Sequence, residues 1–64
     1  MPNKVRDALR LARDEGWYEI RRSGGSHRQF KHPDKPGRVT IAGHPREDIP
    51  PKTWNSILRQ LGLR

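Results

Sequence analysis

Apolar residues recur at helical spacing near both ends of the chain. In the first segment the i, i+3, i+4, i+7 positions are Val5, Ala8, Leu9 and Ala12. We expect this helix to run from Asn3, a residue type suited to an N-cap, to Glu15, with Gly16 at a left-handed C-cap. In the second segment the same spacing is kept by Trp54, Ile57, Leu58 and Leu61. Because proline is favoured in the first turn, this helix is predicted to begin at Pro50–Pro51 and to end at Gly62.

Between these helices the pattern changes to one typical of short strands. Aromatic and β-branched residues favour strands at 17–22, 27–32 and 38–42. The turns between them are predicted at Ser23-Gly24-Gly25-Ser26 and at Asp34-Lys35-Pro36-Gly37. A loop at 43–48 leads to the last helix. We therefore expect one α+β domain over residues 1–64, in which both helices cover one face of a three-stranded antiparallel sheet.

Strand alternation assigns each sheet residue to the helix-covered face or to an open face. The residues expected to face the helices from the second and third strands are Phe30, Val39 and Ile41. The residues expected on the open face of these strands are His27, Gln29, Lys31, Arg38 and Thr40. In the first strand, Tyr18 and Ile20 are predicted to point inward, and Glu19 and Arg21 outward. The open face would then be basic and suited to a phosphate backbone.

The charge of the chain favours a polyanionic partner. Its 64 residues include 14 Lys and Arg against 7 Asp and Glu, which gives a formal net charge of +7. A small domain this basic attracts nucleic acid, and the planar guanidinium of arginine, the commoner of the two bases here, matches phosphate well. With only 30% hydrophobic residues the core must be small, so we expect marginal stability or help from a partner.

Composition also excludes several kinds of site. The absence of cysteine removes disulfides, thiol nucleophiles and Cys-ligated zinc. No apolar run approaches the length of a membrane span, and the N-terminal residues lack the apolar stretch of a secretory signal, so we expect a soluble cytoplasmic protein with no membrane partner. His27 and His32 would project to opposite faces of a strand, which argues against a shared metal. We expect no metal and no cofactor.

His27 is the residue best suited to chemistry. It begins a predicted strand directly after a Gly-Gly turn and has basic neighbours in sequence. Cleaving RNA without a metal requires a base for the ribose 2′-OH and an acid for the leaving oxygen, and an imidazole with an ordinary pKa of about 6.5 suits both tasks. Nearby cations would stabilise the charge that builds on the phosphorane. The spacing alone favours an ordinary surface histidine in a hairpin, and the local chemistry is compatible with catalysis without requiring it.

The remaining histidines and both tryptophans have simpler interpretations. His32, before Pro33, is predicted to be a turn or packing residue, and His44 a loop residue. Trp17 and Trp54 occupy periodic positions, which favours core aromatics over base-stacking platforms.

Several segments in a fixed order carry a resemblance to a known family. They are Gly16-Trp17-Tyr18, Arg21, Gly25-Ser26-His27-Arg28-Gln29-Phe30-Lys31-His32-Pro33, Lys35-Pro36-Gly37-Arg38-Val39-Thr40-Ile41, Thr53 and Asn55-Ser56-Ile57-Leu58-Arg59-Gln60-Leu61-Gly62-Leu63. Together they span nearly the whole chain and resemble the HicA family, small messenger-RNA interferases of bacterial and archaeal toxin–antitoxin modules.

The resemblance implies a fold, a catalytic residue and a partner. The implied fold is double-stranded-RNA-binding-like, with the order helix, three strands, helix. The implied catalytic residue is His27, and a HicB-type antitoxin is implied to cover the active face, which suits a basic toxin and an acidic partner. Together with the open basic face, the resemblance assigns RNA binding to Gly25, Ser26, Arg28, Lys31, Arg21, Arg22 and Arg38.

Three functions are compatible with the sequence. The first is a toxin endoribonuclease that cleaves mRNA in a metal-independent reaction dependent on His27. The second is a non-catalytic RNA-binding module of the same fold, which predicts salt-sensitive binding without cleavage. The third is a degenerate member that only binds an antitoxin-like protein. In each case the isolated chain is expected to be monomeric, because few apolar residues remain for an interface.

Overall fold

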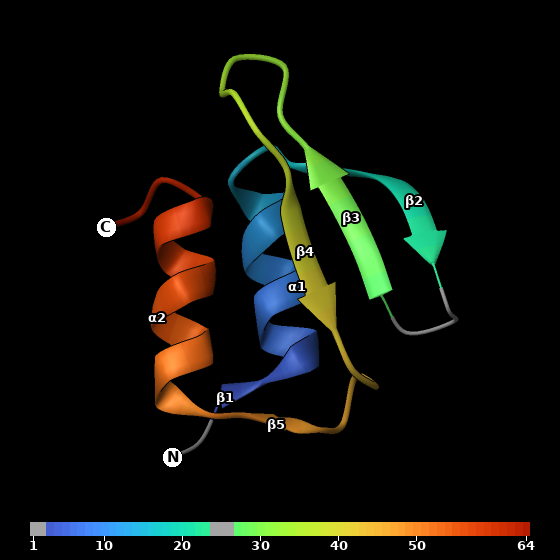
Figure 1. Cartoon of the computed structure of the whole chain (residues 1–64), viewed down its shortest axis with the longest axis vertical. Coiled ribbons are helices and arrows are strands. Elements are labelled where there is room, and N and C mark those ends of the chain that lie inside the picture. Colours follow the sequence, from blue (N-terminus) through green and yellow to red (C-terminus); the bar gives the residue numbers. More distant parts are fainter. Residues whose placement is uncertain (1–2, 24–26) are drawn as a thin grey trace.

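The computed structural model of the chain describes residues 3–23 and 27–64. Its elements, in order, are β1 (Asn3–Lys4), α1 (Val5–Asp14), β2 (Tyr18–Ser23), β3 (His27–Lys31), β4 (Val39–Ala42), β5 (Asp48–Ile49) and α2 (Pro51–Gln60). Strands β2, β3 and β4 form an antiparallel sheet with β3 in the centre, as Figure 1 shows. The predicted α+β order of helix, three strands and helix is confirmed.

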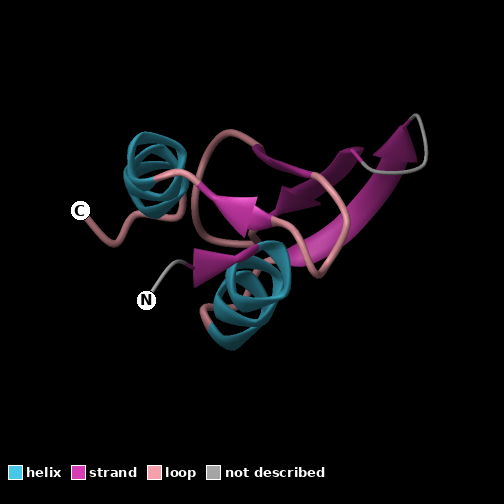
Figure 2. Ribbon diagram, turned by 90° about the horizontal axis from the view of Figure 1, so that it is seen from below, coloured by secondary structure: helices cyan, strands magenta, loops and turns pink. Residues whose placement is uncertain are grey.

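The two helices close the molecule on one side. In Figure 1, α1 lies behind the sheet and α2 lies next to α1, along the β4 edge. Seen from below in Figure 2, the β2–β3 hairpin extends away from both helices, so part of it has no helical cover. Within residues 3–23 and 27–64, neither helix is long and apolar enough to cross a bilayer.

One apolar core joins both helices to the sheet. Phe30, Val39 and Ile41 are fully buried, as strand alternation predicts. The apolar stripes of both helical segments belong to the same core as these three strand residues. The helical residues in it are Val5, Ala8, Leu9, Ala12, Ile57 and Leu61. Trp17 is buried in the same core and Trp54 packs against it, so the prediction of core aromatics is confirmed.

The inward prediction for the first strand is wrong. Tyr18 is 50% exposed and Ile20 is 39% exposed. The strand pairing explains both, because Tyr18 lies opposite Lys31, and a β-bulge shifts the register between Glu19 and Arg21. With two strand residues set against one partner, Ile20 is left outside the regular ladder. Glu19, predicted to point outward, instead pairs with the inward-facing Phe30.

The sequence pattern also did not predict a short two-stranded antiparallel ribbon, which β1 forms with β5 just before α1. β1 and β5 pair antiparallel, with Asn3 opposite Ile49, so α1 begins at Val5 and Asn3 is not its N-cap. The Asp7 carboxylate accepts the backbone N–H of Lys4 at 2.9 Å, which satisfies a backbone donor at the helix entry. The ribbon thereby ties the start of α1 to the segment that leads into α2.

His32 joins the end of α1 to the sheet, which confirms its prediction as a packing residue. Its Nδ1 accepts the backbone N–H of Asp34 at 2.9 Å, so Nε2 carries the proton and donates to the Glu15 carbonyl at 3.0 Å. The ring also packs edge-on against Trp17, with centroids 5.3 Å apart. Both ring nitrogens are therefore engaged in structural hydrogen bonds.

A Gly16→Ala variant is expected to be less stable than a Gly37→Ala variant. Both glycines have positive φ, +91° and +83°, where alanine costs about 1–2 kcal/mol. A Cβ on Gly16 would lie 2.9 Å from His32 Nε2, whereas one on Gly37 would meet nothing within 4 Å. Urea unfolding measures the free energy of unfolding of both variants. An equal decrease in the two variants would show that the His32 contact does not add to the cost at Gly16.

Candidate nucleic-acid interface

The sheet face turned away from the core is polar and basic. Residues that lie opposite each other in an antiparallel sheet share a face. The register places Arg21 and Thr40 on either side of Gln29, and Tyr18 beside Lys31. The described strand residues on this open face include His27, Gln29, Lys31, Arg21, Thr40 and Tyr18, none of which is acidic. A phosphate backbone could therefore approach this face without meeting a strand carboxylate.

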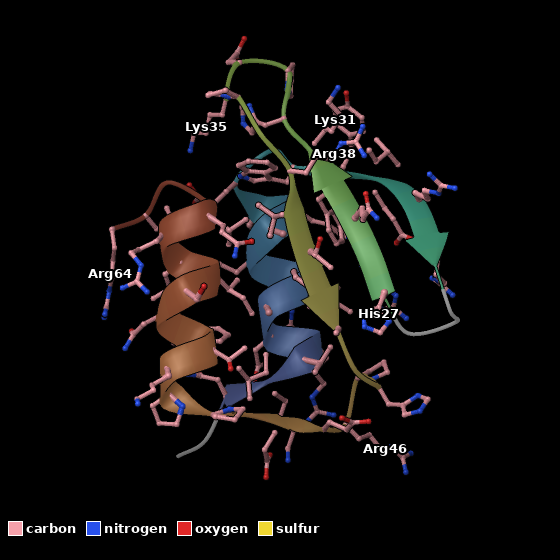
Figure 3. The ribbon with its side chains drawn as sticks, in the orientation of Figure 1. His27, Lys31, Lys35, Arg38, Arg46 and Arg64 are labelled. Carbon is pink, nitrogen blue, oxygen red and sulfur yellow. The ribbon has the colours of Figure 1, made fainter. Side chains whose placement is uncertain are left out.

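His27 is the first residue of β3 and lies opposite Ala42 of β4. Its side chain is exposed, and Figure 3 places it at the end of β3 opposite to Lys31. An exposed imidazole at this position is accessible to a ligand that lies along the sheet.

The basic groups of the open face are spread along β3. Figure 3 shows Lys31 and Arg38 at the end of β3 opposite to His27. The Arg38 guanidinium donates a hydrogen bond to Gln29 Oε1 at 3.2 Å, which holds it over the sheet. At a rise of about 3.3 Å per residue, Lys31 lies about 13 Å along the strand from His27. These two cations therefore suit a different phosphate from the one next to His27.

Of the cations on the open face, Arg21 lies closer to His27 along the strand register than Lys31 does. Arg21 pairs with Gln29, the next residue of β3 on the same face as His27. Arg46 is exposed in the segment between β4 and β5, and Figure 3 shows it at the same end of the molecule as His27. Arg46 could not be singled out from the sequence, because a loop position has no periodic pattern.

Arg22 and Arg28 are not brought together with His27. They pair with each other in the register and lie on the sheet face that carries Phe30, toward α1. Arg28 is half-buried there, while Arg22 is exposed and forms an ion pair with Glu19 at 3.4 Å. Gly25 and Ser26, also predicted to bind RNA, lie outside the described residues.

The described part of the chain holds no group of three or more His, Asp or Glu side chains placed to share a metal ion. His32 is committed to Glu15 and Asp34, and His44 is an exposed loop residue, as predicted. Among the three histidines, His27 alone lies on a regular strand of the open face.

Comparison with known proteins identifies a family for this chain. No curated protein matches it. The family model described as HicA toxin of bacterial toxin–antitoxin matches residues 5–63. This match runs from the first residue of α1 to beyond the end of α2 and so includes the whole three-stranded sheet. The chain therefore belongs to the HicA family of bacterial toxins.

Proposed function

We propose that this toxin is an mRNA endoribonuclease in which His27 acts as a general acid or base and no metal is required. The observation that carries the proposal is the exposed imidazole at one end of an open sheet face, whose described strand residues include cations but no carboxylate. The family membership supports a toxic activity. The geometry supports RNA as the molecule on which it acts.

The reaction is an attack of the ribose 2′-oxygen on the adjacent phosphorus. The new P–O2′ bond closes a 2′,3′-cyclic phosphate, and the P–O5′ bond breaks. One group removes the 2′-OH proton and another protonates the departing 5′-oxygen, and His27 serves in one of these roles. Arg21 would stabilise the charge on the phosphorane, while Lys31 and Arg38 would hold the backbone further along the strand.

We further propose that a HicB-type antitoxin neutralises the toxin by covering the open face. An acidic partner would complement the net charge of +7. Tyr18 and Ile20, both well exposed on or beside this face, would supply apolar contact area. The free toxin would act as a monomer in the cytoplasm, where it meets mRNA.

Cleavage of RNA by the purified toxin in EDTA tests this proposal. A 5′-labelled single-stranded RNA is expected to be cut, leaving cyclic phosphate and 5′-hydroxyl ends. The same sequence with 2′-deoxyriboses is expected to stay intact, because it lacks the attacking oxygen. Cleavage that needs added Mg²⁺, or that also occurs on the deoxy strand, would contradict the mechanism.

A non-catalytic RNA-binding module is the second candidate, and the spread of cations along β3 supports it. It predicts that the protein binds RNA, that the affinity falls steeply as the salt concentration rises, and that no cleavage product forms at any protein concentration. The same gel, read beside a binding measurement, separates the two functions. Binding without cleavage would favour the module.

A further inference from the structure

A second basic site lies on the other side of the sheet from His27. It is a groove of about 420 Å³ between α1 and the β2–β3 hairpin. Its charged lining consists of Arg6, Arg10, Arg13, Arg22, Arg28 and Asp14. Five positive groups and one negative group therefore surround one open space, which we call the arginine groove.

Helix geometry and strand register together build the arginine groove. Arg6, Arg10 and Arg13 are spaced i, i+4 and i+7, so they form one exposed stripe along α1. Arg22 and Arg28 are directly paired on the facing side of the hairpin. Figure 2 shows this hairpin extending past α1.

The positive charge in this groove is poorly compensated by the protein. Among the described residues, the ion pairs include just one of the five arginines, the 3.4 Å contact between Arg22 and Glu19. Arg6, Arg10 and Arg13 are exposed and make no ion pair with another described residue. This uncompensated positive charge points to an anionic ligand.

We propose that the arginine groove binds the RNA backbone at phosphates away from the cleaved bond. This rests on the proposed function for the identity of the ligand. Guanidinium groups match phosphate oxygens in pairs, and a row of them along a helix suits a chain with regularly repeated charges. RNA is favoured over an acidic protein segment because the groove is connected to the face of His27.

The connection runs around the edge strand β2. In the described part of the chain β2 is an edge strand of the sheet, and its adjacent residues Arg21 and Arg22 point to opposite faces. A single strand of RNA held by Arg22 and Arg28 in the groove can therefore pass over this edge to Arg21 and reach His27. The β-bulge at Ile20 sets this arrangement, because it puts Arg21 on the His27 face and Arg22 on the groove face.

Salt-dependent binding of an uncleavable RNA tests the groove. The double variant Arg6→Gln/Arg13→Gln removes two groove charges seven residues apart on α1. Its matched control, Lys52→Gln/Arg59→Gln, removes two exposed charges seven residues apart on α2. The probe is a fluorescein-labelled 20-nucleotide 2′-O-methyl RNA, and polarisation gives the dissociation constant from 50 to 200 mM KCl. Thermal unfolding of both variants shows that each is folded at the assay temperature.

In the parent, the logarithm of the dissociation constant rises with the logarithm of the KCl concentration. The groove variant is expected to reduce this slope by about 1.4, which is about 0.7 for each of the two lost phosphate contacts. The control variant is expected to keep the slope of the parent. Equal slopes for the two variants would overturn the proposal. Unchanged RNA binding combined with lost binding of a poly-glutamate peptide would also overturn it, and would assign the groove to an acidic protein.

This experiment is independent of the proposed cleavage. The 2′-O-methyl probe has no free 2′-OH, so the binding data are the same whether or not the toxin is a nuclease. If the parent fails to cut RNA but the slopes differ, the groove is supported and the nuclease assignment falls. If the parent cuts RNA but the slopes agree, the nuclease assignment stands and the groove proposal falls.

Discussion

Replacing His27 by alanine is expected to lower kcat for RNA cleavage by about 10²- to 10⁴-fold, the range typical for loss of a general acid or base. RNA binding should change by only a few-fold, because the surrounding cations remain. The side chain is exposed at the first position of β3, so its removal leaves no cavity and should not change the free energy of unfolding appreciably. The expected effect is therefore confined to the chemical step.

Growth of cells that express the toxin is a second measure of the activity that His27→Ala is expected to lose. Expression of the parent is expected to arrest growth, and expression of His27→Ala is not. His44→Ala is a matched control, since His44 is the other exposed histidine and lies in a loop. Equal growth arrest by the parent and His27→Ala, at equal protein levels, would remove His27 from the mechanism.

Phe30→Ala is expected to have the largest effect on stability. Phe30 is fully buried in the central strand, and truncation of a buried phenylalanine costs about 3–5 kcal/mol. A domain of this length has a total stability of about 3–10 kcal/mol, so the variant loses a large part of it. At about 4 °C or more per kcal/mol, Tm should fall by at least about 12 °C in circular dichroism.

Gln29→Ala is the control for this prediction. Gln29 is the neighbour of Phe30 on β3 but faces the opposite side, where it accepts a hydrogen bond from Arg38. Loss of this exposed contact should cost less than about 1.5 kcal/mol. Comparable destabilisation by the two substitutions would contradict the division of β3 into a core face and an open face.

The helices, the core and the glycine beyond the end of α1 could be predicted because each has a local cause. The predicted turn at Ser23-Gly24-Gly25-Ser26 extends outside the described residues and stays a prediction. The 3.6-residue spacing of the apolar residues from Val5 to Ala12 places them on one side of a helix, and the structure buries that side. Gly16 has the positive φ expected beyond a helix end. Phe30, Val39 and Ile41 follow the alternation of two neighbouring strands, and all three are in the core.

The features that could not be predicted depend on pairing between distant segments. The bulge at Ile20 arises where β2 meets β3, and it reverses the expected directions of part of the first strand. The β1–β5 ribbon consists of two-residue strands, which are too short to show any alternation. For the site, the sequence predicted the open face of His27 but could not show that Arg22 and Arg28 join the arginines of α1.

The most direct test of the proposed function compares the parent with His27→Ala in a single-turnover reaction in EDTA. Both proteins are added to one labelled RNA at concentrations well above the dissociation constant, and polarisation confirms that the RNA is bound in each case. The expected result is rapid cleavage by the parent and cleavage slower by at least about 100-fold with the variant. Cleavage at the same rate by both proteins would contradict the assignment of His27 as the catalytic residue.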